Sequence, residues 1–101
     1  MKKISIIVPA HDEEKRISVT LDDYLSYFEG LVHSGTLTEY EILVVINKTT
    51  DRTKEIVEEY QKLNVPLKYL DIPEGGKGLA IMRGFQEALK DKQNSLEVKN
   101  A

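Results

Sequence analysis

Three short polar segments of this sequence carry residue types that can bind a ligand. The first follows an apolar run and contains the consecutive acids Asp12, Glu13 and Glu14. Carboxylates in such a position can accept hydrogen bonds from a sugar hydroxyl or help to hold a metal ion. They are also typical of a first helical turn, where the helix dipole favours acids without any ligand. The residues alone leave both interpretations open.

The second segment, residues 47–51, begins with Asn47 directly after another apolar run. The Asn47 amide offers a donor and an acceptor in one plane, which suits the edge of a nucleotide base. Turns also accept asparagine readily, so a purely structural role is the alternative. At the other end of the segment, Thr50 or Asp51 can cap the helix that follows.

The third segment, residues 73–78, is rich in glycine and opens a predicted helix. Glycines allow close backbone approach, helix N–H groups point outward and Lys77 adds positive charge, which together are typical of a phosphate-binding loop. Arg83, further along the same helix, can reach the same anion. The segment lacks the Walker and the dinucleotide-binding patterns, because Gly78 replaces Ser or Thr in the first and Ile81 replaces a glycine in the second. A plain glycine-rich turn is the alternative.

Composition excludes several other classes of site. The chain has no cysteine, which excludes disulfides, thiolate zinc sites and cysteine nucleophiles. The two histidines, His11 and His33, have no partner at metal-ligand spacing. A net charge of -3, with acids and bases mixed along the chain, indicates no basic surface for nucleic acid. No apolar run approaches the roughly 20 residues that span a bilayer, so we expect a cytoplasmic protein without a membrane segment.

Alternating strand and helix patterns place the three segments. Continuous or alternating apolar runs predict strands over residues 4–8, 40–46 and 67–72. Apolar residues at spacings of three and four predict a helix after each strand, the first ended by Ser34 and Gly35. This order predicts one α/β domain, a three-layer open parallel sheet flanked by helices. The polar segments follow the carboxyl ends of the strands, where such sheets bind ligands.

The three segments together resemble one family. Residues 4–14 (ISIIVPAHDEE), 41–53 (EILVVINKTTDRT) and 76–85 (GKGLAIMRGF) are similar to three ordered motifs of the family 2 glycosyltransferases, which include the dolichyl-phosphate sugar synthases. The resemblance covers roughly residues 4 to 90. Asp12 stands where the family usually has Asn, and Asn47 stands where it usually has a base-recognising Asp.

The resemblance implies the nucleotide-binding half of a GT-A fold, a Rossmann-like sheet with strand order 3-2-1, and a UDP- or GDP-sugar as donor, bound weakly by this portion alone. It places Pro9, Ala10 and Glu13 at the base and ribose, Asn47 at the base, and Lys77 and Arg83 near the base or the diphosphate. In these terms residues 1–90 are the nucleotide-binding half and residues 91–101 a polar tail. The longer family enzyme is expected to transfer sugar to an acceptor hydroxyl.

The sequence departs from the family after residue 91. In the family a fourth strand ends in Asp-x-Asp, whose carboxylates hold Mg2+ or Mn2+ against the donor. No Asp-x-Asp occurs here, so we expect a fragment without cofactor and without transfer activity, from an enzyme that can lie at a membrane surface. The alternative is a non-catalytic interaction or regulatory module that completes its sheet with a partner.

The missing fourth strand leaves one edge of the first strand unpaired. Unpaired strand edges tend to recruit another strand. We therefore expect either that residues 95–99 pair with the first strand, or that two copies of the chain form a homodimer through this edge or the tail.

Overall fold

Two strands buried on both faces form the centre of the fold. The computed structural model describes residues 3–73, 76–88 and 94–98 of the 101-residue chain. The strand β1 (Lys3–Ala10) is buried from its second residue to its end, and β2 (Glu39–Asn47) is buried over its last six residues. Since neither strand has a polar face, helices must cover both sides of the sheet.

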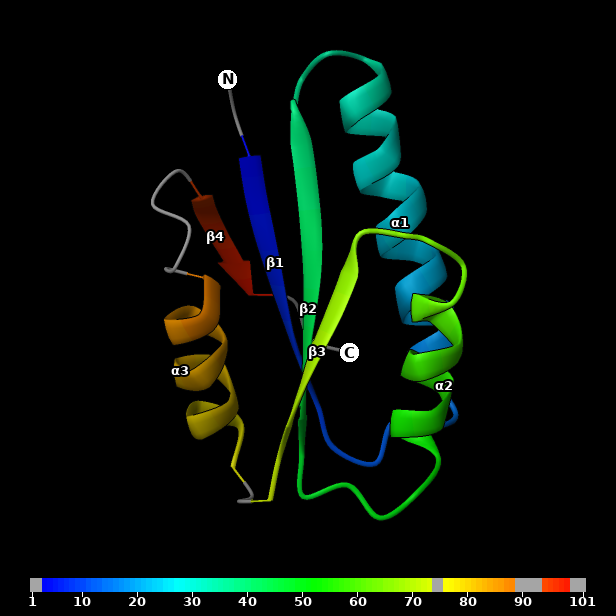
Figure 1. The fold of residues 1–101 in the computed structure, drawn as a ribbon, viewed down its shortest axis with the longest axis vertical. Coiled ribbons are helices and arrows are strands. Elements are labelled where there is room, and N and C mark those ends of the chain that lie inside the picture. The colour runs from blue at the N-terminus through cyan, green and yellow to red at the C-terminus, as the bar shows by residue number, and fades with distance from the viewer. Residues whose placement is uncertain (1–2, 74–75, 89–93, 99–101) are drawn as a thin grey trace.

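The other elements follow the predicted alternation of strands and helices (Figure 1). They are α1 (Ile17–His33), α2 (Thr53–Gln61), β3 (Leu67–Ile72), α3 (Lys77–Ala88) and β4 (Asn94–Val98). The predicted end of the first helix is confirmed, because α1 ends at His33 and Gly35 takes a φ of 83°, which glycine adopts without strain.

All neighbouring strands are parallel, in the order β3-β2-β1-β4. The predicted open parallel sheet with strands in the order 3-2-1 is confirmed. β4 lies on the other side of β1, where Ser95 is opposite Ile4 and Val98 is opposite Ile7. The sequence predicts pairing of residues 95–99 with this edge of β1. Residues 95–98 do pair there, and Lys99 lies outside the described residues.

β4 occupies part of the edge of β1 through which two copies of the chain could associate. β4 pairs with Lys3–Ile7, so over these residues β1 has a neighbouring strand on both sides and no edge for a second copy of the chain. A homodimer through the remaining edge of β1 stays a prediction. A dimer through the outer edge of β4 stays a prediction.

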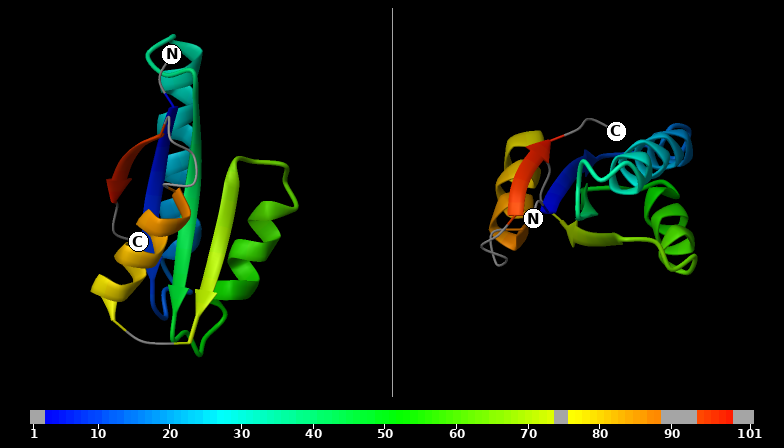
Figure 2. Two further views of the ribbon diagram at one scale, coloured as in Figure 1. Left: turned by 60° about the vertical axis from the view of Figure 1, so that its left-hand side comes forward. Right: turned by 90° about the horizontal axis from the view of Figure 1, so that it is seen from above.

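The helices form two unequal layers on the sheet (Figure 2). α1 and α2 cover one face, where the alternate residues Ile4, Ile6 and Val8 of β1 join a large apolar core. α3 covers the other face, where Ile7 packs with a smaller set that consists of Leu43, Val45, Ile72, Ala80 and Ala88. None of the helices in the described ranges is long and apolar enough to cross a membrane.

Gly84 allows α3 to lie close to the sheet. A Cβ atom built at this position would be 2.6 Å from Cγ2 of Ile7 and 3.2 Å from Cγ2 of Val45. The helix therefore contacts β1 and β2 at a distance that a larger residue would prevent. This contact sets the position of α3 and of the glycine-rich segment that precedes it.

Candidate functional site

The three polar segments meet at one rim of the sheet, at the lower end of the view in Figure 1. They follow β1, β2 and β3 in turn, and these strands are parallel, so their carboxyl ends share one edge. The prediction that the segments lie along one rim is therefore confirmed by the topology. Their side chains show how the segments are joined.

The Asn47 side chain connects all three segments. Its neighbours determine the orientation of its amide, whose nitrogen donates to the Ala10 carbonyl at 2.7 Å and whose oxygen accepts from the Gly76 N–H at 3.3 Å. Only 4% of Asn47 is exposed. A buried amide with both ends paired stabilises the arrangement of the loops, whereas either end left unpaired would cost free energy.

The main chain around Asn47 adds two further bonds. The Nδ1 atom of His11 donates to the Asn47 carbonyl at 2.9 Å, which assigns the proton of this nitrogen because a carbonyl can only accept. The N–H of Lys48, which has a φ of 48°, donates to the Ile72 carbonyl at 3.0 Å. The end of β2 is thus bonded to the ends of both neighbouring strands.

Asp12 joins the loop after β1 to the loop after β2. Its Oδ1 atom accepts from the N–H of Thr50 at 2.8 Å and from the N–H of Asp51 at 3.3 Å. Its φ of 50° lies in the left-handed region, which Asp and Asn tolerate better than most residues. These contacts give Asp12 a structural role whether or not a ligand binds.

Asp51 and Thr53 complete the connection between the two loops. The N-cap of α2 is Arg52, which makes no side-chain cap bond, and not Thr50 or Asp51 as predicted. Asp51 instead accepts from the N–H of Thr53, the first residue of α2, at 2.9 Å and from the N–H of Glu14 at 3.1 Å. The buried Thr53 hydroxyl donates to Asp51 and accepts from the N–H of Glu13 at 2.8 Å. Burial alone would raise the pKa of Asp51, but the bonds from Thr53 and Glu14 outweigh it and lower that pKa.

Glu13 presents a partly shielded carboxylate next to these bonds. Its side chain is 15% exposed, and its Oε2 atom forms an ion pair with Arg16. That buried oxygen accepts no well-aligned hydrogen bond among the described residues. The ion pair holds this oxygen without a well-aligned hydrogen bond, since charge attraction needs no fixed angle. The carboxylate of Glu13 thus retains acceptor capacity at the position predicted for a ribose contact.

Pro9 and Ala10 form the wall of the rim through their backbone. Both are buried, Ala10 with 1% of its surface exposed. The Ala10 carbonyl is the group that the Asn47 amide contacts, so Ala10 and Asn47 lie together as predicted for one pocket. Binding of a base by Pro9, Ala10 or Asn47 stays a prediction.

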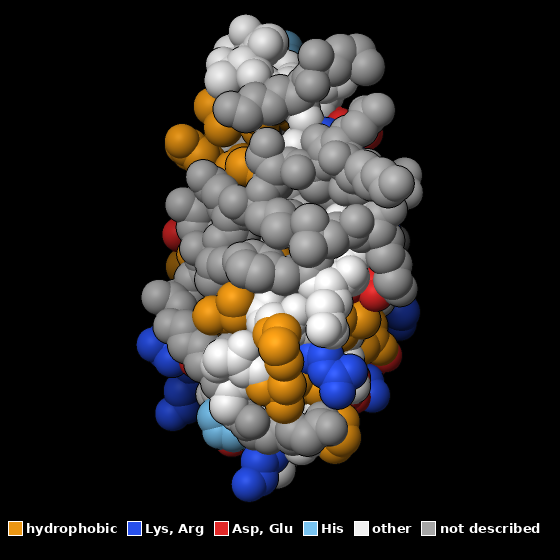
Figure 3. Space-filling model, turned by 90° about the vertical axis from the view of Figure 1, so that its left-hand side faces the viewer, with side chains coloured by type: hydrophobic (Ala, Val, Ile, Leu, Met, Phe, Trp, Pro, Cys, Tyr) orange, Lys and Arg blue, Asp and Glu red, His pale blue; other side chains and the backbone are white. Residues whose placement is uncertain are grey.

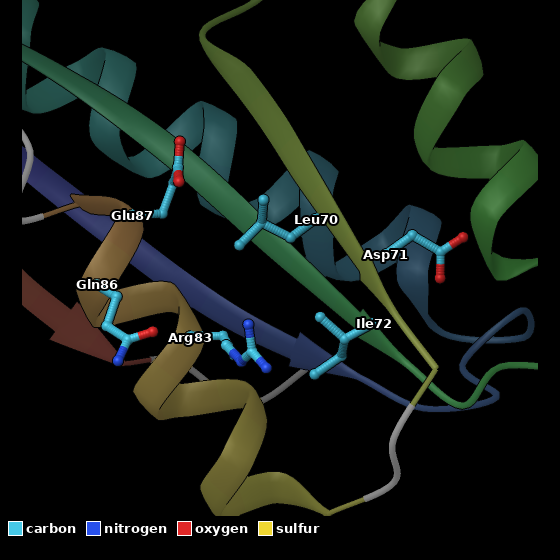
Figure 4. Close-up of a pocket in the computed structure, with 6 residues that line it drawn as sticks. All are labelled: Leu70, Asp71, Ile72, Arg83, Gln86 and Glu87. Carbon is cyan, nitrogen blue, oxygen red and sulfur yellow. The ribbon is translucent and has the colours of Figure 1, made fainter.

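The two predicted cationic residues belong to α3. Lys77 is its first residue, and its side chain lies outside what the structure describes. Arg83 lies on the exposed side of α3, beside a cleft of about 290 Å³ that it lines with Gln86, Glu87 and the β3 residues Leu70, Asp71 and Ile72 (Figure 4). In the described part of the chain Arg83 makes no hydrogen bond or ion pair, including with Asn47 or Glu13.

Figure 3 shows the face that α3 and β4 present. Lys and Arg side chains gather at the lower end of this face, the end where the rim lies, next to hydrophobic side chains. Cationic side chains at this end can attract an anion, although the cleft beside Arg83 also contains the acids Asp71 and Glu87. The described bonds of the rim do not include Arg83.

Sequence reasoning missed the role of Thr53 and the bonds of Asp12. Both depend on contacts between loops that are far apart in the sequence. The available signal was the series of Asp, Thr and Asn residues after two strands, because such side chains often bond to nearby backbone. No group of three or more His, Asp or Glu side chains that could hold a metal is present among residues 3–73, 76–88 and 94–98.

Comparisons with known proteins identify the family that shares this pattern. The profile of the family described as Glycosyl transferase family 2 matches residues 5–91. A dolichyl-phosphate beta-glucosyltransferase of Trichomonas vaginalis is 37% identical over 82 residues, which are 80% of this chain and 25% of the relative. A human dolichyl-phosphate beta-glucosyltransferase is 36% identical over 59 residues, 58% of this chain and 18% of the relative.

A bacterial relative has a different named acceptor. The poly(ribitol-phosphate) beta-N-acetylglucosaminyltransferase of Staphylococcus aureus is 37% identical over 79 residues, 77% of this chain and 13% of that protein. The chain therefore spans about a quarter or less of the length of these curated relatives.

Proposed function

Because this chain belongs to glycosyl transferase family 2, we propose that its rim binds the nucleotide part of a nucleotide-sugar donor. The observation that carries the proposal is the joining of three loops by the Asn47 amide. That arrangement keeps the Glu13 carboxylate, the end of β1 and the first residues of α3 at one edge of the sheet. A nucleotide has a hydroxyl, a base and phosphates to match these groups.

Each part of the nucleotide has a proposed partner of suitable chemistry. The Glu13 carboxylate can accept from a ribose hydroxyl, and the backbone at Pro9 and Ala10 can border the base. The first N–H groups of α3, with Lys77, can bind the diphosphate. Arg83 adds positive charge beyond the rim, where it can attract the phosphates during approach.

The relatives support a role of this chain in binding the sugar donor more than a role in binding the acceptor. They are named for dolichyl phosphate and for poly(ribitol-phosphate), and their matches of 82 and 79 residues must overlap over most of this 101-residue chain. A portion that enzymes with different acceptors share is expected to serve what they have in common, the sugar donor. For a longer protein that includes this chain we propose transfer of the sugar to an acceptor hydroxyl by a single direct displacement, which inverts the configuration at the sugar carbon.

A divalent metal is expected for the longer family enzyme, and the described residues do not provide its site. Mg2+ and Mn2+ need several oxygen ligands, and no cluster of three acidic or histidine side chains occurs in the described ranges.

A non-catalytic interaction module is the second candidate. The observation that favours it is the short edge strand β4, whose outer side has no neighbouring strand among residues 3–73, 76–88 and 94–98. Such an edge can pair with another chain, including a second copy. We propose a cytoplasmic location in either case, at the membrane surface where a longer enzyme acts on a lipid acceptor.

Isothermal calorimetry with UDP and GDP, with and without Mn2+, tests nucleotide binding. We expect weak binding of one nucleotide, and R83A should reduce its affinity by about three- to tenfold because a charge that attracts the phosphates is lost. K62A is the matched control, since Lys62 is an exposed cation just after α2. Absence of heat for both nucleotides at about millimolar concentration would contradict the proposal.

A further inference from the structure

We propose that the groove between α3 and the outer edge of β3 binds an extended peptide segment of another protein. The segment adds to the sheet as a further strand and places an acidic side chain against Arg83. The groove is the cleft of about 290 Å³ that lies between these two elements (Figure 4). This interaction goes beyond the proposed function and requires no bound nucleotide.

The outer edge of β3 has unpaired backbone groups. β3 pairs with β2 on one side and has no neighbouring strand on the other in the described part of the chain. The Ile72 carbonyl accepts from the N–H of Lys48 at 3.0 Å, so alternate residues of β3, counted back from Ile72, face β2. The N–H and C=O groups of Tyr69 and Asp71 therefore face outward, where no described residue pairs with them. Such groups can form a ladder with an added strand.

Side chains from both elements give the groove an apolar floor and a polar wall. Leu70 and Ile72 point from β3 toward α3, whereas Asp71 points to the opposite face of the sheet (Figure 4). The side chains of α3 that line the groove are Arg83, Gln86 and Glu87. The volume is small for a drug-sized ligand, but it suits the side chains of a segment whose backbone lies along β3.

Arg83 gives the groove a positive charge that the chain itself does not pair. It is exposed and makes no hydrogen bond or ion pair with any described residue. The acids of the groove are already engaged, because Oδ2 of Asp71 lies 2.9 Å from Nζ of Lys54 and Glu87 has an interaction of its own. A carboxylate is the complementary group, since a guanidinium can donate to both of its oxygens at once.

These features define the residue pattern of the partner segment. Alternate side chains of an added strand lie on the same face of the sheet. On the α3 face, one of them should be apolar to contact Leu70 and Ile72, and the next on that face should be acidic to pair with Arg83. The expected pattern is therefore an apolar and an acidic residue separated by one other residue, in an extended segment.

A second copy of β3 does not have this pattern. The residues that β3 places on the α3 face are Lys68, Leu70 and Ile72, since they alternate along the strand. A second copy would therefore bring another cation toward Arg83 and no acid. Charge complementarity favours an acidic segment of a different protein.

The test uses a synthetic peptide of about eight residues that alternates threonine and valine, with glutamate in place of one central valine. An NMR titration of the isotope-labelled chain locates the binding site. We expect the largest shifts in β3 and in the part of α3 that lines the groove, and none at the outer edge of β4. The same peptide with glutamine in place of glutamate should bind about two- to fivefold more weakly.

N-methylated peptides separate backbone pairing from side-chain contacts. In an added strand only alternate residues direct their N–H groups toward β3. Methyl groups on that set of amides should abolish binding, whereas methyl groups on the other set should leave the affinity within about twofold. Both peptides are tested, and equal behaviour of the two would overturn the proposal.

Charge reversal tests the role of Arg83. R83E should bind the glutamate peptide about three- to tenfold more weakly than wild type, because attraction becomes repulsion. A peptide with lysine in place of glutamate should bind R83E to within about twofold of the wild-type pair. K62E is the matched control, since it makes the same change of charge at an exposed residue just after α2 and should leave both affinities unchanged.

Three further results would overturn the proposal. They are an absence of shifts with the glutamate peptide, shifts centred on β4, and equal affinity of R83E for the two charged peptides. Shifts in β3 that depend on protein concentration without peptide would place a second copy in the groove, which contradicts it as well. Nucleotide binding is measured separately by calorimetry, so a chain that binds nucleotide but no peptide keeps the proposed function and loses this inference.

Discussion

Gly84 and Ile7 are packed so closely that a Cβ atom at position 84 would lie 2.6 Å from Cγ2 of Ile7. The isoleucine is fully buried in β1 and is β-branched, so its side chain has few other rotamers to adopt. The contact therefore holds α3 against the central strand. The position of the glycine-rich segment that precedes α3 depends on it.

G84A should lower the free energy of unfolding by about 1–3 kcal/mol, because the added methyl group forces Ile7 or α3 to move. Urea unfolding followed by circular dichroism measures the change. G30A is the control, since nothing lies within 4 Å of a Cβ at that exposed position in α1. It should raise stability by about 0.5–1 kcal/mol. Equal effects of the two substitutions would show that Gly84 is not a packing constraint.

D51N should lower the stability of the fold at neutral pH. It should also make stability fall less steeply as the pH becomes acidic. Burial opposes ionisation of Asp51, but bonds from Thr53 and Glu14 lower its pKa overall. The ionised group therefore stabilises the fold above its unfolded pKa of about 3.9, and this contribution is lost as pH falls through the lower folded value. Thermal melts from about pH 7 to pH 2 measure it. D23N, on the exposed side of α1, is the control and should keep the acid dependence of wild type.

Tyr40 should make the fold sensitive to alkali. Burial and then the hydrogen bond to Glu29 raise the pKa of Tyr40, so the folded protein holds this phenol neutral. Its contribution is present below the unfolded pKa of about 10 and is lost as pH rises through the folded value. Y40F should therefore lose stability less steeply than wild type above about pH 10. Y27F alters an exposed ring, so its stability should depend on alkaline pH as that of wild type does. If the stability of Y40F also shows the wild-type pH dependence, Tyr40 is not the source of the alkali sensitivity.

D12A should lower stability by about 1 kcal/mol, since the N–H groups of Thr50 and Asp51 lose their acceptor. D12N keeps an acceptor oxygen and suits the φ of 50°, so it should stay within about 0.5 kcal/mol of wild type. Chemical unfolding of both variants provides the comparison. A D12N protein as unstable as D12A would mean that the negative charge, and not the acceptor, joins the loops.

The sheet and its helices were predictable because local patterns determine them. The apolar runs in β1 and β2 leave no polar face, and the apolar period of α1 ends at a glycine that takes a positive φ. The position of the rim followed from the order of the elements alone. β4 was less certain, because its sequence has no strong period, and its parallel pairing with β1 depends on a contact distant in the chain.

The side chains of the site were less predictable because their partners lie far away in sequence. Asn47 was predicted as a base contact, and its bonds to Ala10 and Gly76 became visible only in three dimensions. The spacing of Arg83 from Lys77 predicted a shared anion, which stays a prediction, and it gave no indication that Arg83 lines a cleft with Leu70 and Ile72. Side-chain spacing along a helix does not specify which neighbouring element the helix faces.

The position of β1 between β2 and β4 has a consequence for the order of folding. β1 pairs with β2 across one intervening helix, whereas all the other described elements lie between β1 and β4 in the sequence. Closing the longer loop costs more chain entropy, so the β1–β2 pair with α1 is expected to form first and β4 to dock last. During synthesis this edge of β1 therefore stays unpaired until β4 has docked. We expect chaperone binding or aggregation to involve β1 during that time.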